Sequence, residues 1–174
     1  MRRILLSCGV LAVLTLPSAA TARATAAAKP GYLVISKAVG DGGVNGRPVA
    51  TLVVKGFVLG RVSQEARVQI IQLPSAAGQG APQVVGADVS SKSIKWRRFH
   101  GREYNGSNFR FRAMGGLYRL VVRGSGVYIF AGGRGQVTVR GSSVSPQKDG
   151  TYSVNGGTAR SLPKLPVTRK IGRG

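Results

Sequence analysis

Cationic and aromatic side chains alternate closely in the stretch SIKWRRFHGREYNGSNFRFR, residues 93–112. It holds six Lys or Arg and five aromatic residues against one acid. Guanidinium groups bind phosphate, sulfate and carboxylate through paired hydrogen bonds, and exposed aromatic rings stack on bases or sugars. The pattern therefore predicts a surface that binds a polyanion. Its candidate ligand-binding residues are Lys95, Trp96, Arg97, Arg98, Arg102, Arg110 and Arg112.

We expect this stretch to form two paired strands, residues 94–100 and 108–112, joined by a loop that contains Asn105-Gly106. Alternation in the second strand sends Phe109 and Phe111 to the core and Arg110 and Arg112 outward. The outward arginines would then lie beside cations of the first strand. Like charges opposite one another destabilise a sheet, so this arrangement indicates either a bound counter-anion or effective screening by salt.

Trp96 has two possible roles in this arrangement. We expect it to be the large core residue of a small β domain. If it is exposed instead, its ring can stack on a sugar or a base.

Residues for enzyme chemistry are few. The acids are Asp41, Glu65, Asp88, Glu103 and Asp149, and His100 is the only histidine. These residues supply neither a zinc site of several His or Cys ligands nor the motif of a serine hydrolase. We therefore expect no catalytic residue and no cofactor. The alternative is a hydrolase that uses a pair of carboxylates.

A calcium site is conceivable in GDGGVNGRP, residues 40–48, where Asp41 and Asn45 offer oxygen ligands between flexible glycines. One carboxylate is few for Ca²⁺, and the spacing does not match an EF-hand. We expect a long hairpin turn here and no metal.

The net charge gives the strongest indication of function. The chain has 26 Lys or Arg against five acids, for a formal charge of +21. A charge of this size attracts polyanions and makes their binding sensitive to salt. Solubility alone is the alternative explanation of the charge.

The elements that position these residues are short strands separated by Gly, Asn-Gly and Asp-Gly turns. In residues 117–123, Tyr118, Leu120 and Val122 share one face and Arg119 and Arg123 the other, as in a half-buried strand. The other expected strands are 32–37, 48–60, 65–73, 83–89, 94–100, 108–114, 127–131, 136–140, 151–154 and 158–162.

Glycines punctuate these strands. Gly56 is expected to mark a bulge or break in the longest strand. Residues 123–126, 132–135 and 155–157 are each expected to reverse the chain tightly. No substantial helix is expected after residue 24. The sequence thus predicts an all-β fold, an antiparallel β-sandwich of about nine to eleven short strands, with a small β-barrel as the alternative.

The first 24 residues are typical of a signal peptide. Arg2 and Arg3 precede an apolar run, Ile4–Leu16, that is too short to span a bilayer, and small residues follow it. Cys8, the only cysteine, lies inside this run, so the mature chain would have no disulfide. We expect a flexible lead-in at 25–31, a single β domain at 32–162 and a flexible basic tail at 163–174.

Together these features predict a secreted or cell-surface protein without enzyme activity. It would associate, through the basic and aromatic hairpin, with an anionic wall polymer, acidic glycan, nucleic acid or lipid head groups. The alternative is a structural or assembly component that binds another envelope protein along an uncovered sheet edge.

Overall fold

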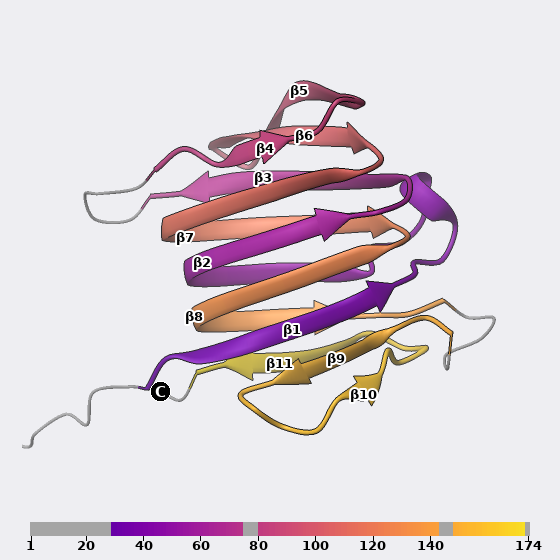
Figure 1. Cartoon of the computed structure of the whole chain (residues 1–174). Helices are drawn as coiled ribbons and strands as arrows, with labels where there is room; N and C mark the ends of the chain where they lie inside the picture. The colour runs from indigo at the N-terminus through magenta and orange to yellow at the C-terminus, as the bar shows by residue number, and fades with distance from the viewer. Residues whose placement is uncertain (1–28, 75–79, 143–147, 173–174) are drawn as a thin grey trace, which may run out of the picture.

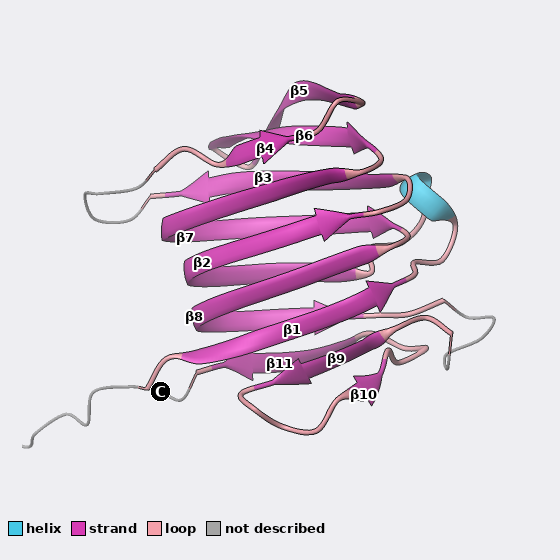
Figure 2. Ribbon diagram, viewed as in Figure 1, coloured by secondary structure: helices cyan, strands magenta, loops and turns pink. Residues whose placement is uncertain are grey.

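The computed structural model describes residues 29–74, 80–142 and 148–172, and these residues form an antiparallel β structure. Figures 1 and 2 show the strands, with one 3-10 turn, η1 (Gly43–Asn45). The all-β prediction is confirmed. The strands are β1 (Gly31–Ala38), β2 (Ala50–Val62), β3 (Ala66–Leu73), β4 (Gln83–Val85), β5 (Val89–Trp96), β6 (Phe99–Gly106), β7 (Phe109–Gly124), β8 (Val127–Val139), β9 (Thr151–Val154), β10 (Arg160–Ser161) and β11 (Val167–Ile171).

All eleven strands belong to one open sheet that is folded over into two layers (Figure 1). The strand order is β10-β9-β1-β8-β2-β7-β3-β6-β5, with β11 paired to β8 and β4 paired to β7. The long strands β2, β7 and β8 pass through both layers. The front layer contains β4, β1, β9 and β10, together with residues 57–62 of β2, 109–114 of β7 and 127–132 of β8. The back layer contains β5, β6, β3 and β11, together with residues 50–55 of β2, 117–124 of β7 and 135–139 of β8.

A row of glycines forms the crease between the layers. Gly56 of β2 is the register partner of both Gly116 on β7 and Gly133 on β8. Gly56 and Gly133 have positive φ angles, and a Cβ on either would overlap backbone of the other strand. Gly56 therefore marks the irregularity that the sequence predicts. The tight turn expected at 132–135 is wrong, because these residues continue β8 across the crease.

Gly115 is an extra residue at the crease of β7. Gly56 pairs with Gly116 and Phe57 with Met114, so Gly115 has no register partner on β2. Such a bulge reverses the side-chain alternation. Phe109 and Phe111 before it and Tyr118 after it therefore all enter the core. The predicted inward faces at 109–111 and 118–122 are confirmed, but as one strand and not two.

The core lies between the two layers and receives apolar side chains from both. Val58 and Val62 of β2 in the front layer and Leu52 and Val54 of β2 in the back layer are 0% exposed and belong to one cluster. All four lie at even positions, so the bent strand keeps one face inward. The two layers thus share one hydrophobic core, as expected of a sandwich.

Several predicted boundaries differ from the structure. The reversals expected at 123–126 and 155–157 are confirmed, although β7 continues to Gly124. Of the strand expected at 83–89, only β4 forms. Val167–Ile171, expected within a flexible tail, forms β11 and pairs with β8. The predicted signal peptide lies outside the described residues. The part of the chain that the structure describes contains no helix with the length and hydrophobicity of a membrane span.

Candidate anion-binding site

The hairpin that carries the basic and aromatic residues is β5–β6, and its turn is Arg97–Arg98. Trp96 and Phe99 are the last register partners before the turn, and Arg97 adopts a φ of 54°. The predicted hairpin between 94–100 and 108–112 is therefore wrong. After β6 the chain crosses to the front layer at residues 107–108, where Asn108 also has a positive φ.

Trp96 lies at the centre of a cluster of rings and guanidinium groups. Its ring stacks with Phe99, with centroids 6.1 Å apart and an interplanar angle of 27°. The guanidinium carbon of Arg97 lies 4.9 Å from the Trp96 ring centroid and that of Arg119 4.4 Å from it. Arg98 lies 5.3 Å from the Phe99 centroid. We call Trp96, Arg97, Arg98, Phe99, Arg119 and Arg123 the Trp96 cluster.

The expectation that Trp96 fills the core is wrong. Trp96 is half-buried and does not belong to the core cluster. It lies on the outer surface of the back layer, because it contacts Arg119, whose neighbours Tyr118 and Leu120 face the core. Its two cation–π contacts bring together residues from the hairpin and from β7, which is separated from β5 by β6 and β3.

The charges of the Trp96 cluster repel one another. Burial lowers the pKa of the Arg119 guanidinium, and the neighbouring charges of Arg123 and Arg97 lower it further. Arginine nevertheless stays protonated at neutral pH. Its charged form is therefore held in an unfavourable environment, and an anion placed between these groups would relieve the repulsion.

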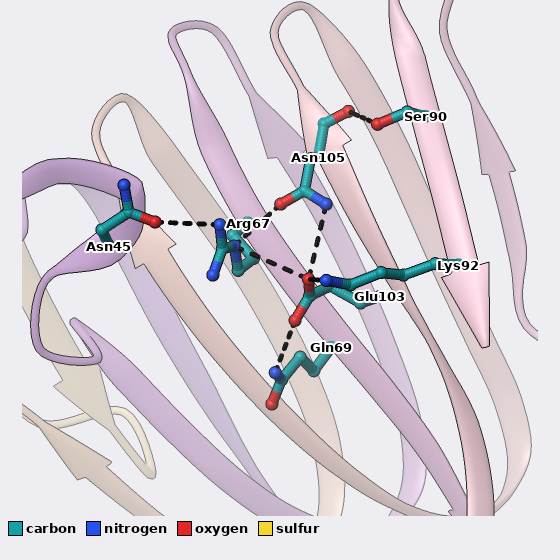
Figure 3. A network of polar contacts seen from close by, with 7 residues as sticks. All are labelled: Asn45, Arg67, Gln69, Ser90, Lys92, Glu103 and Asn105. Atoms are coloured by element: carbon teal, nitrogen blue, oxygen red, sulfur yellow. Dashed lines mark hydrogen bonds and ion pairs between the residues drawn. The ribbon is translucent and has the colours of Figure 1, made fainter. Parts of the chain in front are cut away.

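Glu103 does not supply that anion, because a network of its own neutralises it (Figure 3). Glu103 is 3% exposed, and its carboxylate accepts hydrogen bonds from Gln69 at 2.7 Å and Asn105 at 3.5 Å. The Lys92 ammonium lies 3.1 Å and the Arg67 Nε 3.7 Å from it. Burial alone would raise the pKa of Glu103, but these hydrogen bonds and the Arg67 charge hold it below its usual value.

The network also ties together the strands that carry the hairpin. Arg67 of β3 donates to Asn105 of β6 and to Asn45 of η1, each at 2.9 Å. Ser90 of β5 donates to the Asn105 carbonyl at 3.3 Å. Figure 3 shows these side chains converging from β3, β5, β6 and η1. The hairpin that presents Trp96 is thereby tied to the rest of the back layer.

The remaining predicted site residues lie elsewhere. Arg110 and Arg112 face outward from the front layer, where they pair with Arg61 and Leu59 of β2. Lys95 is exposed opposite His100. His100 and Arg102 line a cleft of about 760 Å³ at the open edge of the sandwich. The structure thus brings together Trp96, Arg97 and Arg98, and separates them from the other four predicted residues.

Arg119 and Arg123 are absent from the residues predicted to bind a ligand. Alternation in 117–123 correctly predicts that both face outward. It carries no information on which distant segment they meet, because the strand order is a long-range property. Their contact with the hairpin becomes visible only in the folded sheet.

The acids do not gather in an open cleft. Burial raises the pKa of the Asp149 carboxyl, a backbone hydrogen bond from Ser142 lowers it, and the Asp41 charge raises it. Asp41 and Asp149 are near enough for their charges to interact, but Asp149 is only 3% exposed and so is not open to a substrate. Within the described ranges, no group of three or more His, Cys, Asp or Glu could hold a metal ion.

A scan of protein families and searches of curated proteins and solved structures find no match to this chain.

Proposed function

We propose that this chain is an exported protein without enzyme activity that binds an anionic polymer at the Trp96 cluster. The observation that carries the proposal is the pair of guanidinium groups, Arg97 and Arg119, on the ring of Trp96. Their mutual repulsion makes a phosphate, sulfate or carboxylate group a favourable third partner. A wall polymer, an acidic glycan, a nucleic acid and lipid head groups all supply such groups in series.

The charge of the whole chain supports a polymer over a single small anion. The formal charge of +21 falls to about +18 when the expected signal peptide, with Arg2, Arg3 and Arg23, is removed. A charge of this size raises the local concentration of any polyanion, and screening by salt reduces the effect. Two of the five acids, Glu103 and Asp149, are buried, so their carboxylates are not available to compete with a ligand for the surface cations.

Trp96 provides a direct readout, because it is the only tryptophan of the chain. Its fluorescence should change when inorganic polyphosphate, dextran sulfate or polyglutamate is titrated into the mature protein. Uncharged dextran should leave it unchanged. The affinity should fall steeply with added salt, since counterions compete for the same charges.

The double variant Arg97→Gln/Arg119→Gln tests the site itself. It should bind these polymers at least about tenfold more weakly, because it removes both guanidinium groups from the ring. The matched control, Arg160→Gln/Arg169→Gln, loses the same charge from β10 and β11 and should change the affinity less than about threefold. Equal losses in the two variants would show that only net charge matters and would refute the site.

One feature favours the assembly alternative. β5 ends the strand order and pairs only with β6 among the described strands, so its outer edge is available to a partner strand. Lys92 and Lys95 lie on this strand, and charged edge residues oppose such pairing. Capture of an envelope protein that persists in moderate salt would support this alternative.

A further inference from the structure

The outer surface of the front layer carries several exposed large apolar side chains. Six large hydrophobic side chains are exposed in the described part of the chain, and five of them lie on this surface. They come from five strands of the front layer and alternate with core residues. Their exposed fractions are 44% for Tyr32, 39% for Leu59, 74% for Val85, 51% for Met114 and 42% for Phe130.

Strand register makes this surface continuous. Phe130 of β8 is the cross-strand partner of Leu59 on β2 and Val34 on β1. Phe57 pairs with Met114 on the other side of β2. The Phe130 ring lies 5.4 Å from Phe57 and 6.4 Å from Tyr32, centroid to centroid. We call the outward side chains of β1, β4 and the front-layer parts of β2, β7 and β8 the front face.

Arginines occupy one side of the front face. Arg61 is the register partner of Arg110 and lies 4.5 Å from the Tyr128 ring centroid. Arg112 is paired with Leu59 and donates to Gln83 at 2.7 Å. The outward positions of these segments, all within the described ranges, include no Asp or Glu. The partner of this surface must therefore be apolar and must bring its own negative charge.

The geometry separates the possible partners. Stacking along a flat polysaccharide surface favours rings that share a plane, but the Phe130 ring is tilted by 59° from Phe57 and 55° from Tyr32. Leu59, Val85 and Met114 also offer no stacking surface. Two copies paired symmetrically through this face would bring two sets of three guanidinium groups into one interface without an acid.

We propose that the front face binds an anionic lipid bilayer. Its apolar side chains enter the interface between head groups and acyl chains, while Arg61, Arg110 and Arg112 contact the lipid phosphates. This inference does not depend on the function proposed for the Trp96 cluster, which lies on the opposite layer.

Cosedimentation with vesicles tests the inference. The mature protein should bind vesicles of phosphatidylcholine mixed with phosphatidylglycerol much more tightly than vesicles of phosphatidylcholine alone. The variant Met114→Ser/Phe130→Ser should bind the anionic vesicles at least about tenfold more weakly, because burial of apolar side chains drives insertion. The control Leu165→Ser removes a side chain that is 75% exposed but lies off the front layer, and should change binding less than about twofold.

Trp96 fluorescence distinguishes the two surfaces. Because Trp96 lies on the back layer, vesicles with brominated acyl chains should bind without quenching it. Quenching on binding would place the lipid at the Trp96 cluster and overturn the inference. The inference would also be overturned if the protein did not bind vesicles and instead formed a soluble dimer that the Met114→Ser/Phe130→Ser variant could not form. The same holds if it did not bind vesicles but bound an acidic glycan and the variant lost that binding. That variant should titrate with polyphosphate like the unaltered protein, so failure at one surface leaves the other testable.

Discussion

Glu103 shows at the scale of one residue how a buried acid organises a basic surface. Its pKa is lowered in the folded protein, so its ionised form stabilises the fold. This contribution is present above the ordinary pKa of 4.5 and is lost as the pH falls through the lower folded pKa. Glu103→Gln should therefore reduce the free energy of unfolding at neutral pH by about 1–3 kcal/mol, because Lys92 and Arg67 lose their buried counter-charge.

Urea unfolding of Glu103→Gln and the unaltered protein, at neutral pH and below the folded pKa, checks this expectation. The two proteins should differ at neutral pH and converge in acid. Glu65→Gln is the control, because the exposed Glu65 should change stability by less than about 0.5 kcal/mol. A difference that stays constant across the pH range would show that the ionised carboxylate is not the stabilising group.

At the scale of the elements, the crease decides whether the sheet folds into two layers. Gly133 has a φ of 130°, and a Cβ there would overlap the carbonyl oxygen of Lys55 on β2. Gly133→Ala should destabilise the protein by about 1–3 kcal/mol through backbone strain, with the overlap adding to it. Gly80→Ala is a matched control, because nothing lies within 4 Å of the added Cβ. Thermal unfolding of both variants checks this, and an equal effect would contradict it.

The same element shows where prediction from sequence fails. Gly124–Gly126 and Gly132–Gly135 look alike as sequence, because a reversal and a crease both require glycine backbone angles. The first is a turn and the second lies within β8. Whether the glycines form a turn or a crease depends on whether the strand finds partners both before and after them. In β8, the residues before the crease pair with β1 and those after it pair with β11.

Local alternation, in contrast, predicts which side chains enter the core. Phe109, Phe111, Tyr118, Leu120 and Val122 are inward as expected, because a strand's period of two does not depend on its neighbours. The candidate site is predictable only in part. Sequence alone does not predict the turn at Arg97–Arg98, because WRRF, residues 96–99, fits a continuous strand and a hairpin end equally well. The turn interrupts the alternation at this point. Arg119 joins the cluster through long-range pairing, which alternation does not encode.

At the scale of the whole molecule, the sandwich places its two candidate surfaces on opposite sides. The Trp96 cluster faces outward from the back layer and the front face outward from the front layer, with the shared core between them. A ligand on one surface therefore leaves the other accessible. If both proposals hold, one molecule can hold an anionic polymer against an anionic membrane, although the two partners repel each other.

This arrangement predicts that the mature protein recruits labelled polyphosphate to phosphatidylglycerol-containing vesicles, measured by cosedimentation. Arg97→Gln/Arg119→Gln should still bind the vesicles but carry less polymer, and Met114→Ser/Phe130→Ser should still bind polymer but leave it in solution. Polymer that displaces the protein from the vesicles would instead mean that both ligands compete for one surface. Recruitment by itself can arise from net charge, because a strongly basic protein can contact two polyanions at once. The separate losses in the two variants are what require two surfaces, since a single surface would lose polymer and vesicle binding together.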